Sequence, residues 1–274
     1  MKKVAILFTG ESRTNSLSNN IYTNEMITDS YKKYFFTDSF RHSYDYDIFI
    51  CTDDINIEKT LKFFGNVRVK NIYLMSTQKH LYPVNKEIHN FDFLLNNCKK
   101  MHIEEHKFHE NGVHQFYKCY VAYSILSNYN QEYDYIIRSR LDVEIMHDVQ
   151  TQIETLEKND SAKIIAAWDT FAIGNPDIMN EYLSIINKFG SFNFSKSNHV
   201  FTRNIISIEK YNVMKRNKRE WTYSPEIQLF ECLFEYCAKY NYVIDDTIIG
   251  VNDMISIIRY DEKNKVFTKQ IFDV

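Results

Sequence analysis

Glycine and proline are scarce in this chain, at 6 and 3 of its 274 residues. The chain has no GxGxxG and no GxxxxGK[ST] stretch, the two patterns in which glycines let the backbone wrap around a phosphate. HExxH and GxSxG are also absent, so zinc peptidases and α/β-hydrolases lack their usual motifs here. If the protein binds a nucleotide, its phosphates must be neutralised differently. A divalent cation held by carboxylates is the standard alternative.

Cysteines and long apolar runs are few as well. The five cysteines are odd in number and form no CxxC pair, which argues against a disulfide framework or a cysteine zinc site and favours a reducing compartment. The N-terminal run VAILF is shorter than the apolar core of a signal peptide. No stretch approaches the roughly 20 apolar residues that span a bilayer. We therefore expect a cytoplasmic protein with no transmembrane segment.

Neither sign of charge dominates the composition. The chain has 33 Lys and Arg against 36 Asp and Glu, for a net charge of -3 at pH 7. No global basic field is present to attract nucleic acid, so we expect no nucleic-acid partner. Hydrophobic residues make up 44% and charged residues 25%, which is ordinary for a globular protein. We expect a single domain over residues 1–274.

Buried-type strands alternate with amphipathic helices along the chain. Strands are expected at residues 3–9, 47–52, 67–74, 133–145, 163–167, 243–249 and 256–260. Helices are expected at residues 24–36, 57–64, 113–129, 176–189 and 224–240, and residues 76–112 form a loop-rich insertion. This alternation predicts an α/β fold with a mainly parallel central sheet flanked by helices.

The stretch YDYIIRSRLDVEI, residues 133–145, carries a regular polar pattern. Arg138, Arg140, Asp142 and Glu144 occupy every second position, so on a single strand they would stand in one row. Carboxylates so spaced can share one hard cation, which makes Asp142 and Glu144 candidate ligands of Mn²⁺ or Mg²⁺. The arginines would supply charge for phosphate or orient the carboxylates. The alternative is a solvated strand face with paired charges.

Five sequence elements occur in an order that resembles a loose group of bacterial and giant-virus glycosyltransferases with a GT-A-like fold. They are a G-x-x-R turn after an apolar strand, a DIFI-x-T strand, an IIR-x-R-x-D element in the position of the DxD motif, a D-x-F-A-x-G element and a PE-x-x-L helix. Here they correspond to residues 10–13, 47–52, 136–142, 169–174 and 225–229. The triplet that begins at Asp142 ends in Glu144, where the common motif has Asp.

The resemblance implies a GT-A-like enzyme of polysaccharide or glycan biosynthesis. It would move a sugar from a nucleotide-diphosphate sugar to a carbohydrate or glycoconjugate acceptor, with Mn²⁺ or Mg²⁺ as cofactor. Residues 1–145 would form the nucleotide-sugar-binding half and residues 146–274 the acceptor-side half. If the protein is viral, its location would be the host cytoplasm. The patterns do not specify the sugar, the base, the acceptor or the oligomeric state.

The same resemblance implies roles for individual residues. The residues that would bind the nucleotide sugar are Gly10, Glu11, Arg13, Asp53, Arg138, Arg140 and Asp142. Asp142 and Glu144 would hold the metal ion. Asp169 and Glu226 would be the catalytic residues. Asp169 would face the sugar or acceptor, and Glu226 would deprotonate the acceptor hydroxyl as general base.

Simpler explanations stay open for several of these residues. Gly10 and its neighbours also suit a plain strand-to-helix turn, Asp53 a helix cap, and Glu226 the first turn of a helix. Lys118 is expected to be a solvated lysine. Two other functions are open as well: a catalytically silent sugar- or nucleotide-binding module of the same fold, and a metal-dependent nucleotidyltransferase or phosphohydrolase.

Overall fold

The computed structural model describes residues 1–10, 24–53, 57, 67–75, 79–80, 110–159, 163–167, 169–187, 229, 233, 236, 239–240, 255–261 and 266–270. The helices and strands are β1 (Lys2–Thr9), α1 (Asn24–Tyr34), α2 (Asp38–Ser43), β2 (Tyr44–Thr52), β3 (Val69–Leu74), β4 (Lys79–His80), α5 (Glu110–Leu126), β5 (Tyr135–Arg140), β6 (Val143–Ile145), α6 (Val149–Lys158), β7 (Ile164–Ala167), β8 (Phe171–Gly174), α7 (Pro176–Leu183), η2 (Ile185–Asn187), β9 (Ile255–Asp261) and β10 (Val266–Gln270).

Among the described residues, seven strands form the central sheet, in the order β4-β3-β2-β1-β5-β8-β7. β1 pairs in parallel with β2 on one side and with β5 on the other, and β2 pairs in parallel with β3. β8 runs antiparallel to both β5 and β7, and β4 runs antiparallel to β3. The predicted α/β fold, with a central sheet built on parallel strands and flanked by helices, is confirmed.

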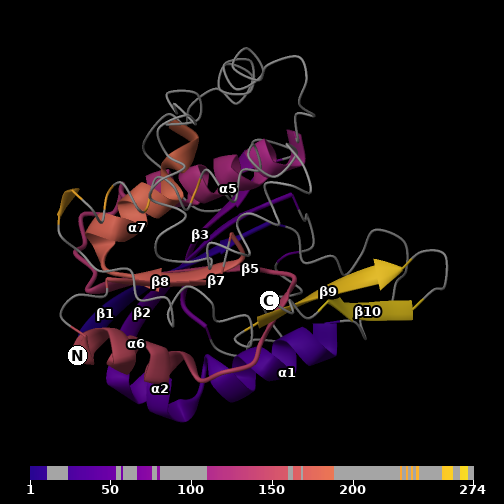
Figure 1. The fold of residues 1–274 in the computed structure, drawn as a ribbon, viewed down its shortest axis with the longest axis horizontal. Coiled ribbons are helices and arrows are strands. Elements are labelled where there is room, and N and C mark those ends of the chain that lie inside the picture. The colour runs from indigo at the N-terminus through magenta and orange to yellow at the C-terminus, as the bar shows by residue number, and fades with distance from the viewer. Residues whose placement is uncertain are drawn as a thin grey trace, which may run out of the picture.

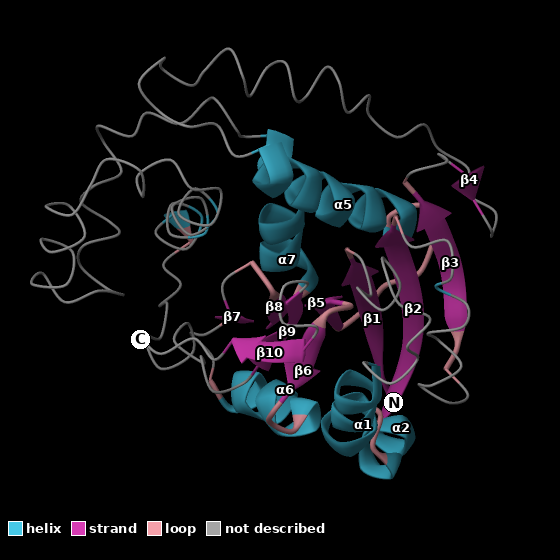
Figure 2. Ribbon diagram, turned by 90° about the vertical axis from the view of Figure 1, so that its right-hand side faces the viewer, coloured by secondary structure: helices cyan, strands magenta, loops and turns pink. Residues whose placement is uncertain are grey.

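Helices cover both faces of the central sheet (Figure 1). α5 and α7 lie on one face, and α1, α2 and α6 lie on the other, as the turned view also shows (Figure 2). Successive side chains of β1 divide between these two layers: Ala5 and Leu7 pack in the cluster with α5 and α7, whereas Ile6 and Phe8 pack in the cluster with α1, α2 and α6. Both faces of β1 are therefore buried, which explains its continuous apolar sequence.

The stretch 133–145 does not form one strand. β5 ends at Arg140, a turn follows at residues 141–142, and β6 then pairs with β9 in a second sheet of order β10-β9-β6. The prediction that the four alternating charged residues form one row on one strand face is therefore wrong. The apolar residues that alternate with them, Leu141, Val143 and Ile145, all pack in the cluster that contains α1 and α6. The turn keeps these three side chains in that cluster while β6 pairs with β9 and not with a strand of the central sheet.

Most expected elements that the structure describes are confirmed within a few residues, among them β1, β2, β3, β7, β9, α1 and the start of α7. The patterns above do not predict α2, β4, α6, β8 or β10. The expected helix at 57–64, the insertion at 76–112, the helix at 224–240 and the strand at 243–249 lie largely or wholly outside the described residues. Within these segments, Ile57 and Leu229 are helical and buried.

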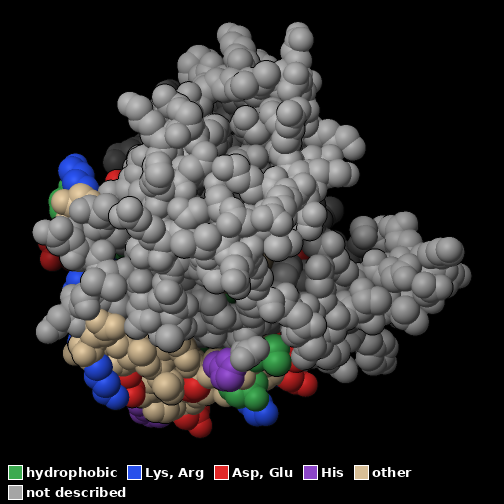
Figure 3. Space-filling model, in the orientation of Figure 1, with side chains coloured by type: hydrophobic (Ala, Val, Ile, Leu, Met, Phe, Trp, Pro, Cys, Tyr) green, Lys and Arg blue, Asp and Glu red, His purple; other side chains and the backbone are tan. Residues whose placement is uncertain are grey.

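The outer surface of α1, α2 and α6 is mostly polar. Figure 3 shows acidic, basic and histidine side chains interspersed along the lower edge of the molecule, where α1, α2 and α6 lie. Such a mixed surface is typical of a solvated helix layer. Within the part of the chain that the structure describes, no helix is both long and apolar enough to cross a membrane.

Gly10 follows β1 in a conformation that favours glycine. Its φ is 92°, and its N–H donates to the carbonyl oxygen of Cys51 at 3.1 Å, which fixes the turn at the end of the strand. A Cβ placed on Gly10 would meet no heavy atom within 4 Å. A side chain at this position would therefore be strained by the backbone alone and not by crowding.

Substitution of Gly10 measures the strain of a side chain at this positive φ, without a contribution from crowding. We expect Gly10→Ala to lower the free energy of unfolding by about 1–2 kcal/mol, since an alanine resists positive φ. Gly10→Asn is the matched control and should lose less, because asparagine tolerates the left-handed region. Urea unfolding of the three proteins checks this. The prediction is contradicted if the two variants lose the same free energy of unfolding, or if Gly10→Ala loses none.

Candidate functional site

The strand order reverses at β1. The chain passes from β1 to β2 and β3 on one side and then crosses to β5 on the other. In open α/β sheets, ligands bind outside the carboxyl ends of the strands at such a reversal. β1 ends at Thr9, followed by Gly10, and β5 ends at Arg140. We refer to the region around these three residues as the β1–β5 edge, and it is the candidate site.

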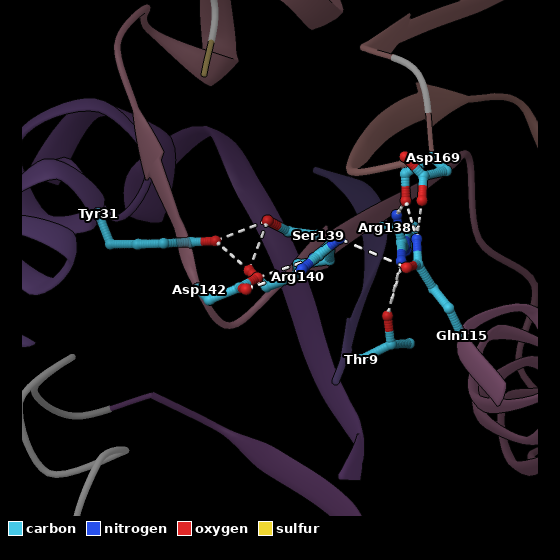
Figure 4. Close-up of polar contacts among 8 residues, drawn as sticks. All are labelled: Thr9, Tyr31, Gln115, Arg138, Ser139, Arg140, Asp142 and Asp169. Carbon is cyan, nitrogen blue, oxygen red and sulfur yellow. Dashed lines mark hydrogen bonds and ion pairs between the residues drawn. The ribbon is translucent and has the colours of Figure 1, made fainter. Parts of the chain in front are cut away.

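Two more elements bring polar side chains to the β1–β5 edge. Phe171 at the start of β8 pairs with Ser139 near the end of β5, so the turn at residues 169–170, which carries Asp169, lies beside the edge. α5 leads into β5 from above the sheet and contributes Gln115, whose side chain donates to the carbonyl oxygen of Asp169 at 3.0 Å. Residues distant in sequence thus meet at one edge of the sheet (Figure 4).

Arg138 is fully buried at this edge, with 0% of its surface exposed. Its Nε and Nη2 donate to Thr9 Oγ1 at 3.2 and 3.0 Å, and its Nη1 donates to the carbonyl oxygen of Asp169. Burial acts to lower the pKa of Arg138, but nearby Cys119, Tyr182 and Asp169 outweigh it and raise the pKa above its ordinary value. One charged guanidinium therefore connects β1, β5 and the turn before β8.

Arg140 and Asp142 form a two-pronged ion pair. Arg140 Nε donates to Asp142 Oδ1 at 2.8 Å, and Nη2 donates to Oδ2 at 2.7 Å. Burial acts to lower the pKa of Arg140, but the charge and hydrogen bonds of Asp142 outweigh it and raise the pKa. The Asp142 side chain is 2% exposed and that of Arg140 is 13% exposed, so only the arginine retains contact with solvent to any extent.

Gln115 links this ion pair to Asp169. Arg140 Nη1 donates to Gln115 Oε1 at 3.4 Å, and Gln115 Nε2 donates to the carboxylate of Asp169 as well as to its carbonyl oxygen. Asp169 is 8% exposed. The four side chains therefore form a continuous hydrogen-bonded chain from Asp142 to Asp169 across the β1–β5 edge.

Asp53 and Lys118 form an ion pair at the carboxyl end of β2, one strand away. The Lys118 side chain is only 12% exposed and that of Asp53 is 29% exposed. The expectation that Lys118 is a solvated lysine is therefore wrong, because α5 places it over the end of β2. Asp53 follows β2, where a group that binds a base or ribose is expected. Its alternative role as a helix cap falls on residues outside the described part of the chain.

Tyr31 supports the end of β5 from the opposite face of the sheet. Its hydroxyl lies 2.6 Å from Ser139 Oγ and donates to the carbonyl oxygen of Arg140 at 3.1 Å. Burial raises the pKa of Tyr31, so the hydroxyl stays protonated and can donate at neutral pH. α1 therefore fixes the backbone from which the Arg140 side chain projects.

The structure brings together a subset of the predicted site residues. Gly10, Arg138, Arg140, Asp142 and Asp169 meet at the β1–β5 edge, and Asp53 lies at the neighbouring strand end. Glu144 lies on β6, in the second sheet. Glu11, Arg13 and Glu226 lie outside the described residues. The sequence patterns miss Thr9, Tyr31 and Gln115, because single hydroxyl and amide residues carry no motif of their own.

The described carboxylates do not fit a divalent cation as they are placed. Both carboxylate oxygens of Asp142 accept hydrogen bonds from Arg140. Glu144 lies on β6, in the three-stranded sheet and not in the central one. Within the described ranges, no group of three or more His, Cys, Asp or Glu side chains is arranged to hold a metal ion. The cation and its two ligands therefore remain predictions from the sequence.

Comparisons with known proteins add little to this picture. No family model matches the chain, and no curated protein matches it. Among solved structures, the chain is similar to the apo crystal structure of mouse xyloside xylosyltransferase 1. The two are 10% identical, the match covers 90% of this chain and 85% of the other, and the TM-score is 0.38. A likeness at this level does not bear on the activity of this chain.

The two arginines of β5 should differ in their effect on stability. Arg138→Lys keeps the charge but cannot reach both Thr9 and the carbonyl of Asp169, so buried acceptors lose a donor. We expect a loss of about 2–3 kcal/mol in the free energy of unfolding. Arg140→Lys keeps one contact with Asp142 and should lose about 1 kcal/mol. Urea unfolding measures both, and equal losses would contradict the distinction.

Proposed function

We propose that the protein is a glycosyltransferase that moves a sugar from a nucleotide-diphosphate sugar to a carbohydrate or glycoconjugate acceptor. The observation that carries this proposal is the buried, charged cluster at the β1–β5 edge, where strand order reverses. The position suits a nucleotide, because ligands of open α/β sheets collect at such a reversal. The order of the five sequence elements, which resembles that of GT-A-like glycosyltransferases, supports the same function.

In this proposal the donor lies across the carboxyl ends of β2, β1 and β5. Asp53 and Lys118, at the end of β2, would contact the base or ribose. Gly10, which follows β1 and has no side chain, would let the diphosphate approach the backbone. The diphosphate would then lie toward Arg140, and the sugar toward Asp169 on the turn beyond β5. This order follows the order of the strands in the sheet.

The reaction exchanges one bond to the sugar for another. The bond between the anomeric carbon and the diphosphate oxygen breaks, and the nucleoside diphosphate leaves with the electron pair. A bond forms between the anomeric carbon and the acceptor oxygen, and the acceptor proton passes to a carboxylate. Glu226 is the predicted base, and Asp169 is the predicted residue that faces the sugar or acceptor. Gln115 orients the Asp169 carboxylate.

A divalent cation remains part of the sequence prediction, with Asp142 and Glu144 as its ligands. Asp142 would have to separate from Arg140 to contact it, since both of its oxygens are engaged.

A second candidate is a silent binding module that recognises the nucleotide sugar without transferring it. The observation that favours it is that Asp53, Asp142 and Asp169 are each paired with Lys118, Arg140 and Gln115, respectively. A carboxylate held in this way is less available to accept a proton from an acceptor. The two candidates share the donor site and differ in whether turnover follows binding.

A screen followed by one substitution tests the proposal. A nucleotide sugar that binds should raise the melting temperature in a thermal-shift screen with and without Mn²⁺, by mass action on the native state. With that donor and a glycan acceptor, we expect Asp169→Asn to lower kcat by about 100-fold or more, since loss of a group that positions the reacting sugar or acceptor costs on this scale. The donor Kd should change by less than about threefold, because the role assigned to Asp169 is in catalysis.

Asp177→Asn, an exposed carboxylate in the first turn of α7, is the matched control and should keep wild-type turnover. Binding without transfer or donor hydrolysis across the acceptor panel would favour the silent module. No binding of any nucleotide sugar, with or without Mn²⁺, would contradict both candidates.

A further inference from the structure

We propose that Arg140 is the cationic group that binds the donor diphosphate, and that Asp142 forms an ion pair with its guanidinium until the diphosphate binds. The β1–β5 edge is then a diphosphate site that works without a divalent cation. The identity of the anion as part of a nucleotide sugar rests on the proposed function. The anion site itself does not, because inorganic pyrophosphate probes it directly.

Exposure and hydrogen bonding separate the two arginines of β5. Arg138 is 0% exposed, and its donors are directed to Thr9 and to the carbonyl oxygen of Asp169. It cannot reach a ligand without dismantling the end of β1. Arg140 is the last residue of β5, and its side chain is 13% exposed. A ligand at the edge therefore meets Arg140 and not Arg138.

The geometry of the Arg140–Asp142 pair is that of a phosphate contact. A guanidinium presents two parallel N–H groups that match a carboxylate and a phosphate equally well. The carboxylate of Asp142 takes both of these donors, at 2.8 and 2.7 Å. Asp142 thus stands where two phosphate oxygens would stand. The same contacts explain why its oxygens are not presented to a metal ion.

Charge balance makes Asp142 a competitor of the anion. Around the edge, the cations Lys118, Arg138 and Arg140 face the carboxylates Asp53, Asp142 and Asp169. Among the described residues these charges cancel, so an arriving diphosphate gains attraction from them by displacing a carboxylate. Asp142→Asn removes one negative charge. The edge then has a net positive charge, and the two N–H donors of Arg140 no longer face a carboxylate. Anion affinity should then rise, whereas the affinity of a metal-held site would fall.

Gln115 would couple the bound anion to the sugar position. It accepts from Arg140 at 3.4 Å and donates to the carboxylate of Asp169. A movement of Arg140 from Asp142 to a diphosphate therefore changes the contacts of the residue that orients Asp169.

Calorimetric titration of pyrophosphate in the presence of EDTA tests the proposal. We expect the wild type to bind, Asp142→Asn to bind about tenfold more tightly, and Arg140→Gln to bind about tenfold or more weakly, as removal of one close charge from an anion site predicts. The double variant with Arg140→Gln and Asp142→Asn replaces the ion pair with two amides and should bind as weakly as Arg140→Gln. Glu157→Gln is the matched control, because it breaks the Lys2–Glu157 pair of 2.8 Å at the opposite end of β1. Its pyrophosphate affinity should equal that of the wild type.

Two results would overturn the inference: pyrophosphate that binds the wild type only when Mn²⁺ is added, or weaker binding to Asp142→Asn than to the wild type. If Asp142→Asn does not fold, the comparison of wild type and Arg140→Gln in EDTA decides. If pyrophosphate binds as expected but no nucleotide sugar binds, the result supports the anion site and contradicts the proposed function. If the enzyme turns over a nucleotide sugar but binds pyrophosphate only with Mn²⁺, the result supports the proposed function and contradicts the metal-free anion site.

Discussion

A single buried guanidinium determines the architecture of the candidate site. Arg138 lies in the core with 0% exposure, and a charge in such a position is tolerated only if its hydrogen-bonding groups are satisfied. Its acceptors are the hydroxyl of Thr9 and the carbonyl oxygen of Asp169. The end of β1, the strand β5 and the turn before β8 must therefore converge, because otherwise a buried cation would be left without partners. The other contacts at the edge depend on this convergence.

Successive side chains of β5 point to opposite faces of the sheet and therefore have different roles. Ile137 belongs to the core layer beneath the sheet, where Tyr31 also holds Ser139 and the carbonyl of Arg140. The side chain of Arg140 reaches Gln115 of α5 on the other layer. Arg138 acts as an internal brace, and Arg140, at the open end of the strand, carries the charge available to a ligand. Two arginines with similar sequence positions thus have different physical roles.

The sequence predicts the central strands well, because the signal for a strand buried on both faces is a continuous apolar run such as that of β1 and β2. It also predicts that Arg138, Arg140, Asp142 and Asp169 belong to one site, and the structure places them at one edge. It fails at the turn after Arg140. Alternation of polar and apolar residues continues through residues 141–145, although the chain changes sheets there, and a period of two cannot reveal that change.

Contacts between distant residues were beyond the reach of the sequence patterns. Lys118 pairs with Asp53 and Gln115 with Asp169 only because α5 crosses over the ends of β2 and β5. The helix α6 did have a readable signal, since Asp148 caps it by accepting from the backbone N–H of Thr151 at 2.8 Å. Asp142 is the instructive case: its position in a DxD-like triplet indicates a metal ligand, whereas its contacts show a partner of Arg140.

The central claim is that the β1–β5 edge binds a diphosphate through Arg140. A crystal structure of the protein with a nucleoside diphosphate, grown without divalent metal, tests it most directly. We expect phosphate oxygens within hydrogen-bonding distance of the Arg140 guanidinium, an open Arg140–Asp142 pair, and unchanged contacts from Arg138 to Thr9 and Asp169. A nucleotide bound at another part of the molecule, or one bound at this edge while the Arg140–Asp142 pair stays closed, would contradict it.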